Sequence, residues 1–270
     1  MKENKKFPKY INLACGNNFV NNSDWLNLDF IEREGVKKTN LLNKLQLKDS
    51  SIEAIYCSHF VEHIPKKYLN FFFNECKRVL KVGGVMRIVV PDFEKMAKEY
   101  LDQRVRGNNL KANFMMTSII DQFVRRESGG ELAEEINQLS AADNKELKQY
   151  VLDRVGNVFE DINTSLGNFD RKLSTRLINI ITKIYVKLIL SLIPKTFYSQ
   201  NVSMAEVGEL HKWIYDKHLL SNILIDCGFM NVQEVNHDYS KIINFPLSLD
   251  TNKYGKPRKG YDSLFLEAIK

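Results

Sequence analysis

Two histidines and a glutamate lie within one short stretch that could carry acid–base chemistry. His59, Glu62 and His63 follow residues 53–57, which are mostly apolar and β-favouring and therefore predict a buried strand. Ligands of an open α/β sheet bind beyond the carboxyl ends of such strands. An imidazole changes charge near neutral pH, so His59 or His63 could accept a proton from a hydroxyl group.

A third histidine, His211, lies far along the chain in a polar and aromatic run, residues 208–216. We predict that His59, His211 and His63 are the catalytic candidates, either as a base or as groups that orient an acceptor. Structural roles are the alternative for each of them. His59 can pack over a bound ligand, and the 208–216 run can begin the following helix, with Asp216 as its N-cap.

A metal site is the other chemistry that this spacing suggests. His59 and His63 are four residues apart, so one helical turn would place both on the same face. The H-E-x-x-H pattern of a zinc-binding helix is absent, however. The four cysteines form no C-x-x-C pair, which argues against a zinc site and against a disulfide framework. We therefore predict no metal ligands and a reducing, cytoplasmic compartment.

The first strands of the chain indicate a second kind of site. Residues 10–13 are mostly apolar and lead into Ala-Cys-Gly at 14–16, small residues that let a ligand approach the backbone. Residues 25–28 predict the next strand, which ends at Asp29. A small turn beside a strand-end carboxylate suits a nucleoside, because the acid can accept hydrogen bonds from both ribose hydroxyls.

The spacing of this site argues against a dinucleotide. A dinucleotide fingerprint has three glycines in G-x-G-x-x-G and an acid about 20 residues later. Here the next glycine after Gly16 is Gly35, and Asp29 comes only 13 residues after Gly16. The segment between the two strands is also too short for the usual crossover helix. A nicotinamide-dependent oxidoreductase is therefore disfavoured.

Three motifs resemble those of class I S-adenosylmethionine-dependent methyltransferases. The first is Ile-Asn-Leu-Ala-Cys-Gly-Asn-Asn at 11–18, with Ala14 where the family usually has glycine. The second is Asp-Trp-Leu-Asn-Leu-Asp at 24–29, and the third is Arg-Val-Leu-Lys-Val-Gly-Gly at 78–84. The resemblance implies an α/β fold: a Rossmann-like, mostly parallel sheet that ends in an antiparallel hairpin and carries a helical insertion.

The same resemblance implies that the cofactor is S-adenosyl-L-methionine. It assigns cofactor contacts to ten residues near the strand ends: Asn12, Ala14, Cys15, Gly16, Asp29, Asn40, Leu41, Ser58, His59 and Glu62. Asn40 stands where the family often has aspartate, and its amide can still hydrogen-bond adenine. Glu62 has a second interpretation, which is to hold His63 in place.

The chain divides into two parts under this interpretation. Residues 1–100 and 206–270 form the cofactor-binding domain, and residues 101–205 form a helical insertion that serves as an acceptor lid, an oligomer contact or a membrane-surface element. Within the insertion, residues 172–193 combine an apolar stripe with a basic one. Such a helix either lies on the inner face of an anionic membrane, or packs against the sheet or a second subunit of a homodimer.

The acceptor is indicated by resemblance alone. Residues 208–216 and 256–264 look like segments of methyltransferases from bacterial surface-polysaccharide gene clusters, which implies O-methylation of a sugar, with a small-molecule or glycan acceptor. One alternative is a non-catalytic cofactor-binding or interaction protein on the same fold. Another is a nucleic-acid methyltransferase, prompted by the net charge of +6. The chain has no N-P-P-Y-like motif, so we predict no nucleic-acid partner.

Overall fold

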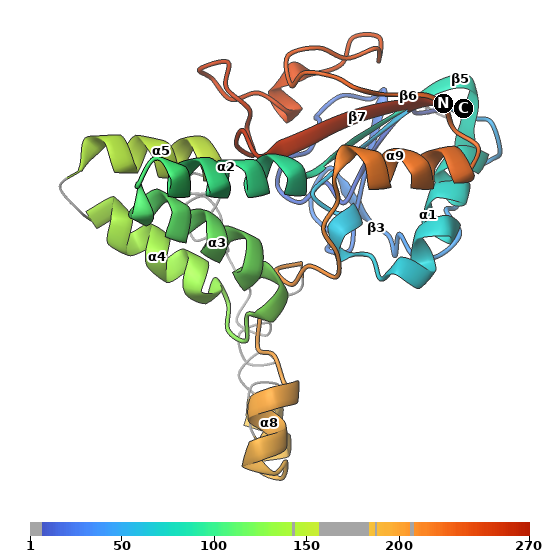
Figure 1. The fold of residues 1–270 in the computed structure, drawn as a ribbon. Helices are drawn as coiled ribbons and strands as arrows, with labels where there is room; N and C mark the ends of the chain where they lie inside the picture. The colour runs from blue at the N-terminus through green and yellow to red at the C-terminus, as the bar shows by residue number, and fades with distance from the viewer. Residues whose placement is uncertain (1–6, 142–143, 157–183, 187, 206–207) are drawn as a thin grey trace.

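The computed structural model describes residues 7–141, 144–156, 184–186, 188–205 and 208–270. Within these residues, seven strands form one sheet in the order β3-β2-β1-β4-β5-β7-β6 (Figure 1). The strands are β1 (Tyr10–Leu13), β2 (Trp25–Asp29), β3 (Val36–Lys38), β4 (Ile52–Ser58), β5 (Leu80–Pro91), β6 (Met230–Glu234) and β7 (Ser263–Ile269). Strands β1 to β5 pair in parallel, whereas β7 runs antiparallel to both β5 and β6. This arrangement confirms the predicted fold class.

The two faces of the sheet are covered in different ways. Helices α1 (Lys66–Val79) and α9 (Lys217–Asp226) pack on one face, where they share a core with the inward side chains of the strands. The other face packs against the loop between β6 and β7, which contains the short helix η2 (Leu247–Leu249). Because both faces are covered, the central strands β4 and β5 are apolar over most of their length.

Two local features follow the sequence closely. Asp216 caps helix α9, since its carboxylate accepts a hydrogen bond of 2.7 Å from the amide of Leu219. This confirms the predicted N-cap. Residues 14–24, between β1 and β2, form turns rather than a helix. The predicted loss of the first crossover helix is therefore also confirmed, and the carboxyl end of β1 is left open.

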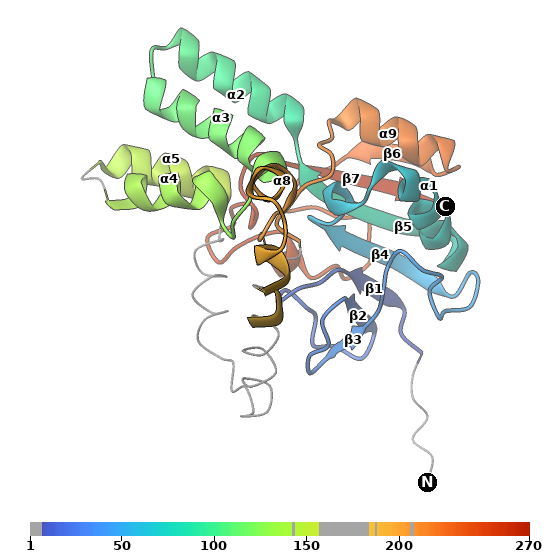
Figure 2. The same ribbon diagram turned by 90° about the horizontal axis from the view of Figure 1, so that it is seen from below.

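The described part of the insertion is helical. It contains α2 (Phe93–Val105), which follows β5 directly, and then α3 (Asn109–Val124), α4 (Gly130–Ala141), α5 (Lys145–Val155) and α8 (Lys195–Asn201). Figure 2 shows α2 to α5 gathered on the side of the molecule toward which β4 points. Their own apolar core includes Phe114, Met115 and Val151. These helices are therefore placed to face whatever binds at the strand ends.

The predicted amphipathic helix at 172–193 falls mainly on residues 172–183 and 187, which lie outside the described residues. Among the residues that the structure describes, no helix is both long and apolar enough to cross a bilayer. A membrane-surface role for this segment stays a prediction.

A buried guanidinium holds the loop between β6 and β7 against the sheet. Arg87, in the middle of β5, is fully buried and pairs with Asp250 at 2.6 Å and with Glu267 at 2.9 Å. It also donates to the carbonyls of Tyr239 and Asn236. Burial raises the pKa of Asp250, and the guanidinium opposes that effect. The pairing therefore compensates two carboxylates that have left water.

Replacing Arg87 by methionine should destabilise the protein strongly. The Arg87→Met variant leaves two buried carboxylates without their cation, which should lower the free energy of unfolding by about 3 kcal/mol or more. Urea denaturation measures this loss. Lys81→Met, on the same strand as Arg87, is the matched control. Its ion pair with Glu53 of β4 is exposed and should contribute less than about 1 kcal/mol. Equal stability of the two variants would contradict this account of Arg87.

Candidate active site

The turn after β1 and the acid at the end of β2 are in direct contact. The amide of Gly16 donates to Asp29 Oδ2 at 2.8 Å, and the amide of Ile31 donates to Asp29 Oδ1 at 2.9 Å. The guanidinium of Arg33 also donates a hydrogen bond to the carbonyl of Gly16 and so links the two strand ends further. Each carboxylate oxygen keeps a lone pair for a ligand. The two parts predicted to bind a nucleoside therefore form one rigid unit.

Two cavities flank this unit. The turn cavity, of about 240 Å³, lies beside residues 14–18, and the Asp29 cavity, of about 430 Å³, lies beside Asp29 and residues 39–42. Of the ten predicted cofactor contacts, nine line one or both: Asn12, Ala14, Cys15, Gly16, Asp29, Asn40, Leu41, Ser58 and His59. A Cβ added at Gly16 would meet no atom within 4 Å, so the turn borders open space.

The Asp29 cavity has the make-up expected for a nucleoside. Besides the carboxylate, its wall is largely apolar and includes Phe30, Ile31, Leu41, Phe60 and Ile64. A flat base can pack on such side chains while a carboxylate fixes the adjoining sugar. The residues present therefore fit an adenosine-containing cofactor.

His59 stands where three cavities meet. It lines the turn cavity, the Asp29 cavity and a third one, the His211 cavity, which holds about 400 Å³. Its backbone has a φ of +49°, a conformation that is uncommon outside glycine, and its amide donates to the carbonyl of Val89. Strained residues of this kind gather at functional sites because the surrounding structure must hold them there.

The His59 ring contacts a polar group on each side. Its Nδ1 is 3.3 Å from Glu62 Oε1, and its Nε2 is 3.4 Å from the hydroxyl oxygen of Ser263. A carboxylate beside Nδ1 favours the tautomer with the proton on that nitrogen. This leaves the lone pair of Nε2 directed toward the hydroxyl side.

The segment that carries His211 is attached to the end of β4 through its backbone. The amides of Lys212 and Trp213 both donate to the carbonyl of Glu62, at 2.7 and 3.1 Å. His63 Nδ1 lies 3.2 Å from the carbonyl of Leu210, and the His211 amide donates to the carbonyl of Gln122 in α3. The rings of His63 and His211 consequently stack edge to face, with centroids 4.7 Å apart.

Burial and the neighbouring histidines set the pKa values of His211 and Glu62. Burial lowers the pKa of His211 to about 4, although the nearby Glu62 carboxylate acts in the opposite direction. His211 is therefore neutral at pH 7. Burial by itself would raise the pKa of Glu62, but the contact with the His59 imidazole and the charges of the histidines outweigh it and hold that pKa below its usual value. Among the effects that lower the pKa of Glu62, the contact with His59 is the largest.

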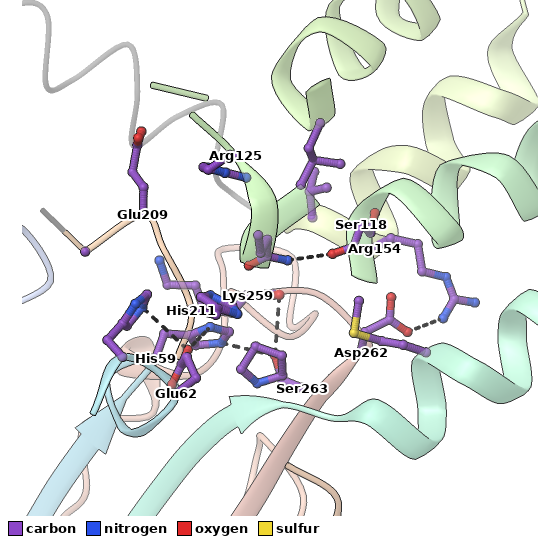
Figure 3. Close-up of a pocket in the computed structure, with 17 residues that line it drawn as sticks. His59, Glu62, Ser118, Arg125, Arg154, Glu209, His211, Lys259, Asp262 and Ser263 are labelled. Atoms are coloured by element: carbon purple, nitrogen blue, oxygen red, sulfur yellow. Dashed lines mark hydrogen bonds and ion pairs between the residues drawn. The ribbon is translucent and has the colours of Figure 1, made fainter. Parts of the chain in front are cut away.

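The His211 cavity lies between the sheet and the insertion (Figure 3). All three predicted catalytic histidines line it: His59, His63 and His211. Glu62 also lines this cavity and neither of the other two. Glu62 nevertheless lies 3.3 Å from His59, which is a predicted cofactor contact, so its assignment to the cofactor stays a prediction.

The opposite wall of the His211 cavity was not predicted from the sequence. It contains Ser118, Gln122 and Arg125 from α3 and Arg154 from α5. Arg125 pairs with Asp121, and Arg154 pairs with Asp262 and Glu99. No sequence motif marks these residues, and only the packing of the helices brings them to the strand ends.

A model of the methyltransferase domain family matches residues 27–88, which span β2, β3, β4, α1 and most of β5. The chain contains a methyltransferase domain. Its cofactor is S-adenosylmethionine, and the turn and Asp29 cavities are where the residues of the chain fit it. No curated protein matches the methyltransferase in sequence.

Several solved methyltransferase structures resemble the chain distantly. One from Archaeoglobus fulgidus is 12% identical, with a TM-score of 0.41 over 98% of this chain and 87% of that one. One from Mesorhizobium loti is 14% identical, with a TM-score of 0.38 over 97% and 90%. One from Methanosarcina mazei is 13% identical, with a TM-score of 0.38 over 97% and 91%. These likenesses are weaker than the family match and add nothing to it.

Removing the Asp29 carboxylate should weaken cofactor binding. We expect Asp29→Ala to raise the Kd for S-adenosylmethionine about 10-fold or more, because hydrogen bonds to a charged group contribute roughly 1.5–3 kcal/mol. Titration calorimetry measures the Kd, and circular dichroism checks that the turn stays folded. Glu34→Ala, an exposed change in the same connection, is the control. A change within about 2-fold, well below that contribution, would show that the cofactor lies elsewhere.

Proposed function

We propose that the methyltransferase O-methylates a hydroxyl group of a sugar or glycan precursor, with His59 as the base. One observation carries the proposal: His59 lies where the cofactor cavities meet the His211 cavity, with Nδ1 on a buried carboxylate and Nε2 beside a hydroxyl oxygen. A hydroxyl acceptor must lose a proton as it is methylated, so a base at this junction suits it.

Methyl transfer from a sulfonium requires few chemical steps from the chain itself. S-adenosylmethionine supplies an electrophilic methyl group on a sulfonium leaving group when it is bound. The chain has to place the acceptor oxygen in line with that methyl group and exclude competing water. His59 Nε2 takes the proton that the hydroxyl loses, while Glu62 keeps the ring oriented and balances the positive charge that the ring gains.

The composition of the His211 cavity supports a sugar acceptor. Its volume of about 400 Å³ is within the range of small-ligand sites. Its lining offers hydroxyl, amide, carboxylate and cationic groups, namely Ser118, Gln122, Glu209, Asp262 and Lys259. The two arginines of the wall are held in ion pairs. Such a wall presents donors and acceptors together, which suits a ligand with many hydroxyls.

The division of the chain is part of this proposal. Residues 1–100 and 206–270 hold the cofactor, and residues 101–205 contribute the outer wall of the acceptor cavity through α3 and α5. The insertion then acts as an acceptor lid. The cavity wall does not test three other parts of the prediction. These are a homodimer, a cytoplasmic location and contact of residues 172–193 with the membrane.

Loss of the His59 imidazole should slow methyl transfer. With labelled S-adenosylmethionine and a panel of nucleotide sugars and cell-envelope glycans, we expect one acceptor class to be labelled. His59→Ala should lower kcat for it about 100-fold or more, as expected for loss of a general base. His237→Ala is the control, because this half-buried histidine lies outside the three cavities.

Two results would contradict the proposal. The first is labelling of nitrogen or carbon acceptors but of no hydroxyl compound in the panel. The second is an O-methylated product that forms equally fast with His59→Ala and His237→Ala. Either result would leave the cofactor site intact, because Asp29 and its cavity are tested separately.

A further inference from the structure

The proposed reaction does not explain the buried carboxylate of Glu62. Its side chain is fully buried, and neither carboxylate oxygen has a hydrogen bond of good geometry. The His59 contact at 3.3 Å reaches Oε1 alone. A buried carboxylate whose lone pairs are unsatisfied costs several kcal/mol unless a cation compensates it. The Oε2 atom is therefore the clearest sign of a missing partner in the described part of the chain.

Two imidazoles surround this carboxylate. His63 Nε2 is 4.0 Å from Glu62 Oε1, and one ligand atom each from Glu62, His63 and His211 can be chosen so that all lie within 4.8 Å of one another. His63 Nδ1 lies 3.2 Å from the carbonyl of Leu210, which can only accept, so Nδ1 carries the proton. The lone pair of His63 is then on Nε2, the nitrogen that faces Glu62.

The backbone holds these three side chains together before any ligand arrives. The carbonyl of Glu62 binds the amides of Lys212 and Trp213, and the His211 amide binds α3. Three segments far apart in the chain are thus fixed to one another. Metal ligands are usually positioned in this way, with the second ring nitrogen of a histidine donating to a backbone carbonyl.

We propose that Glu62, His63 and His211 bind a divalent transition-metal ion of the zinc type. Two imidazole nitrogens and one carboxylate oxygen are the ligand set of several catalytic zinc sites, which keep a fourth position open. The sequence alone predicted no metal ligands, because His59 and His63 have the spacing of H-E-x-x-H but lack the glutamate directly after the first histidine. The structure pairs His63 with His211 instead and leaves His59 free to act as the base.

The open position would face the His211 cavity, which all three ligands line. On the basis of the proposed function, we assign it to the acceptor oxygen. A hydroxyl bound to a divalent metal loses its proton more readily. The proton passes to His59 Nε2, the oxygen forms its bond to the methyl carbon, and the carbon–sulfur bond breaks with its electron pair going to sulfur. Glu62 can bind the metal through Oε2 while Oε1 keeps its contact with His59.

Metal binding can be measured without cofactor or acceptor. The full chain is stripped with a chelator, and Zn²⁺ is titrated by calorimetry while thermal unfolding is followed in parallel. We expect one Zn²⁺ per chain and a raised Tm, since an ion that binds only the folded state stabilises it. His63→Ala and His211→Ala should each weaken Zn²⁺ binding more than about 100-fold, beyond the loss caused by removing an outer hydrogen-bond partner.

Two further variants separate loss of a zinc ligand from poor folding and from zinc binding elsewhere. Glu62→Gln keeps the size of the side chain and removes its charge, so it should lose zinc affinity even if the histidine variants fold poorly. His218→Ala removes an exposed histidine in α9 and should bind zinc as the unaltered chain does. Absence of zinc binding at micromolar concentrations would overturn the proposal, and so would binding that persists in the Glu62, His63 and His211 variants. Neither outcome bears on methyl transfer itself.

Discussion

The carbonyl of Glu62 is the point on which the candidate site depends. It accepts hydrogen bonds from the amides of Lys212 and Trp213, and so it joins the end of β4 to a segment about 150 residues further along. This contact helps to hold His211 beside His59 and His63, which follow β4. With it, His59, His63 and His211 share one cavity, and the cofactor cavities open beside it. A backbone contact of this kind constrains the position of a side chain without using the side chain itself.

The cofactor side of the site could be predicted because its geometry follows from local rules. Parallel strands bring their carboxyl ends to one edge, so a turn after β1 and an acid after β2 must be neighbours. The hydrogen bond from Gly16 to Asp29 shows how close they are. The absence of a crossover helix was also predictable, since the segment was too short for one. In each case the residues that matter are within about one supersecondary unit of each other.

The acceptor side could not be predicted in the same way. Arg125 and Arg154 reach the cavity only because α3 and α5 pack together, and their sequence neighbours carry no motif. Glu62 illustrates a second limit. The resemblance gave it two interpretations, a cofactor contact or a group that holds His63, and the structure shows it lining the His211 cavity beside His59 and His63. Which way a side chain faces in the short turn after β4 depends on contacts from distant segments. Arg87 was missed for a related reason, since a charge within an apolar strand has meaning only once its partners are known.

The pairing of Arg87 also bears on the order in which the chain can mature. Its carboxylate partners, Asp250 and Glu267, lie 163 and 180 residues further along the chain, and β7, which covers the edge of β5, belongs to the same late part. A nascent chain therefore carries β5 without its neighbour on one edge, and Arg87 without its carboxylates, until residues 250–269 have been synthesised. Exposed edges of this kind recruit other strands. Until β7 joins the sheet, the edge of β5 is therefore open to pairing with strands of other chains.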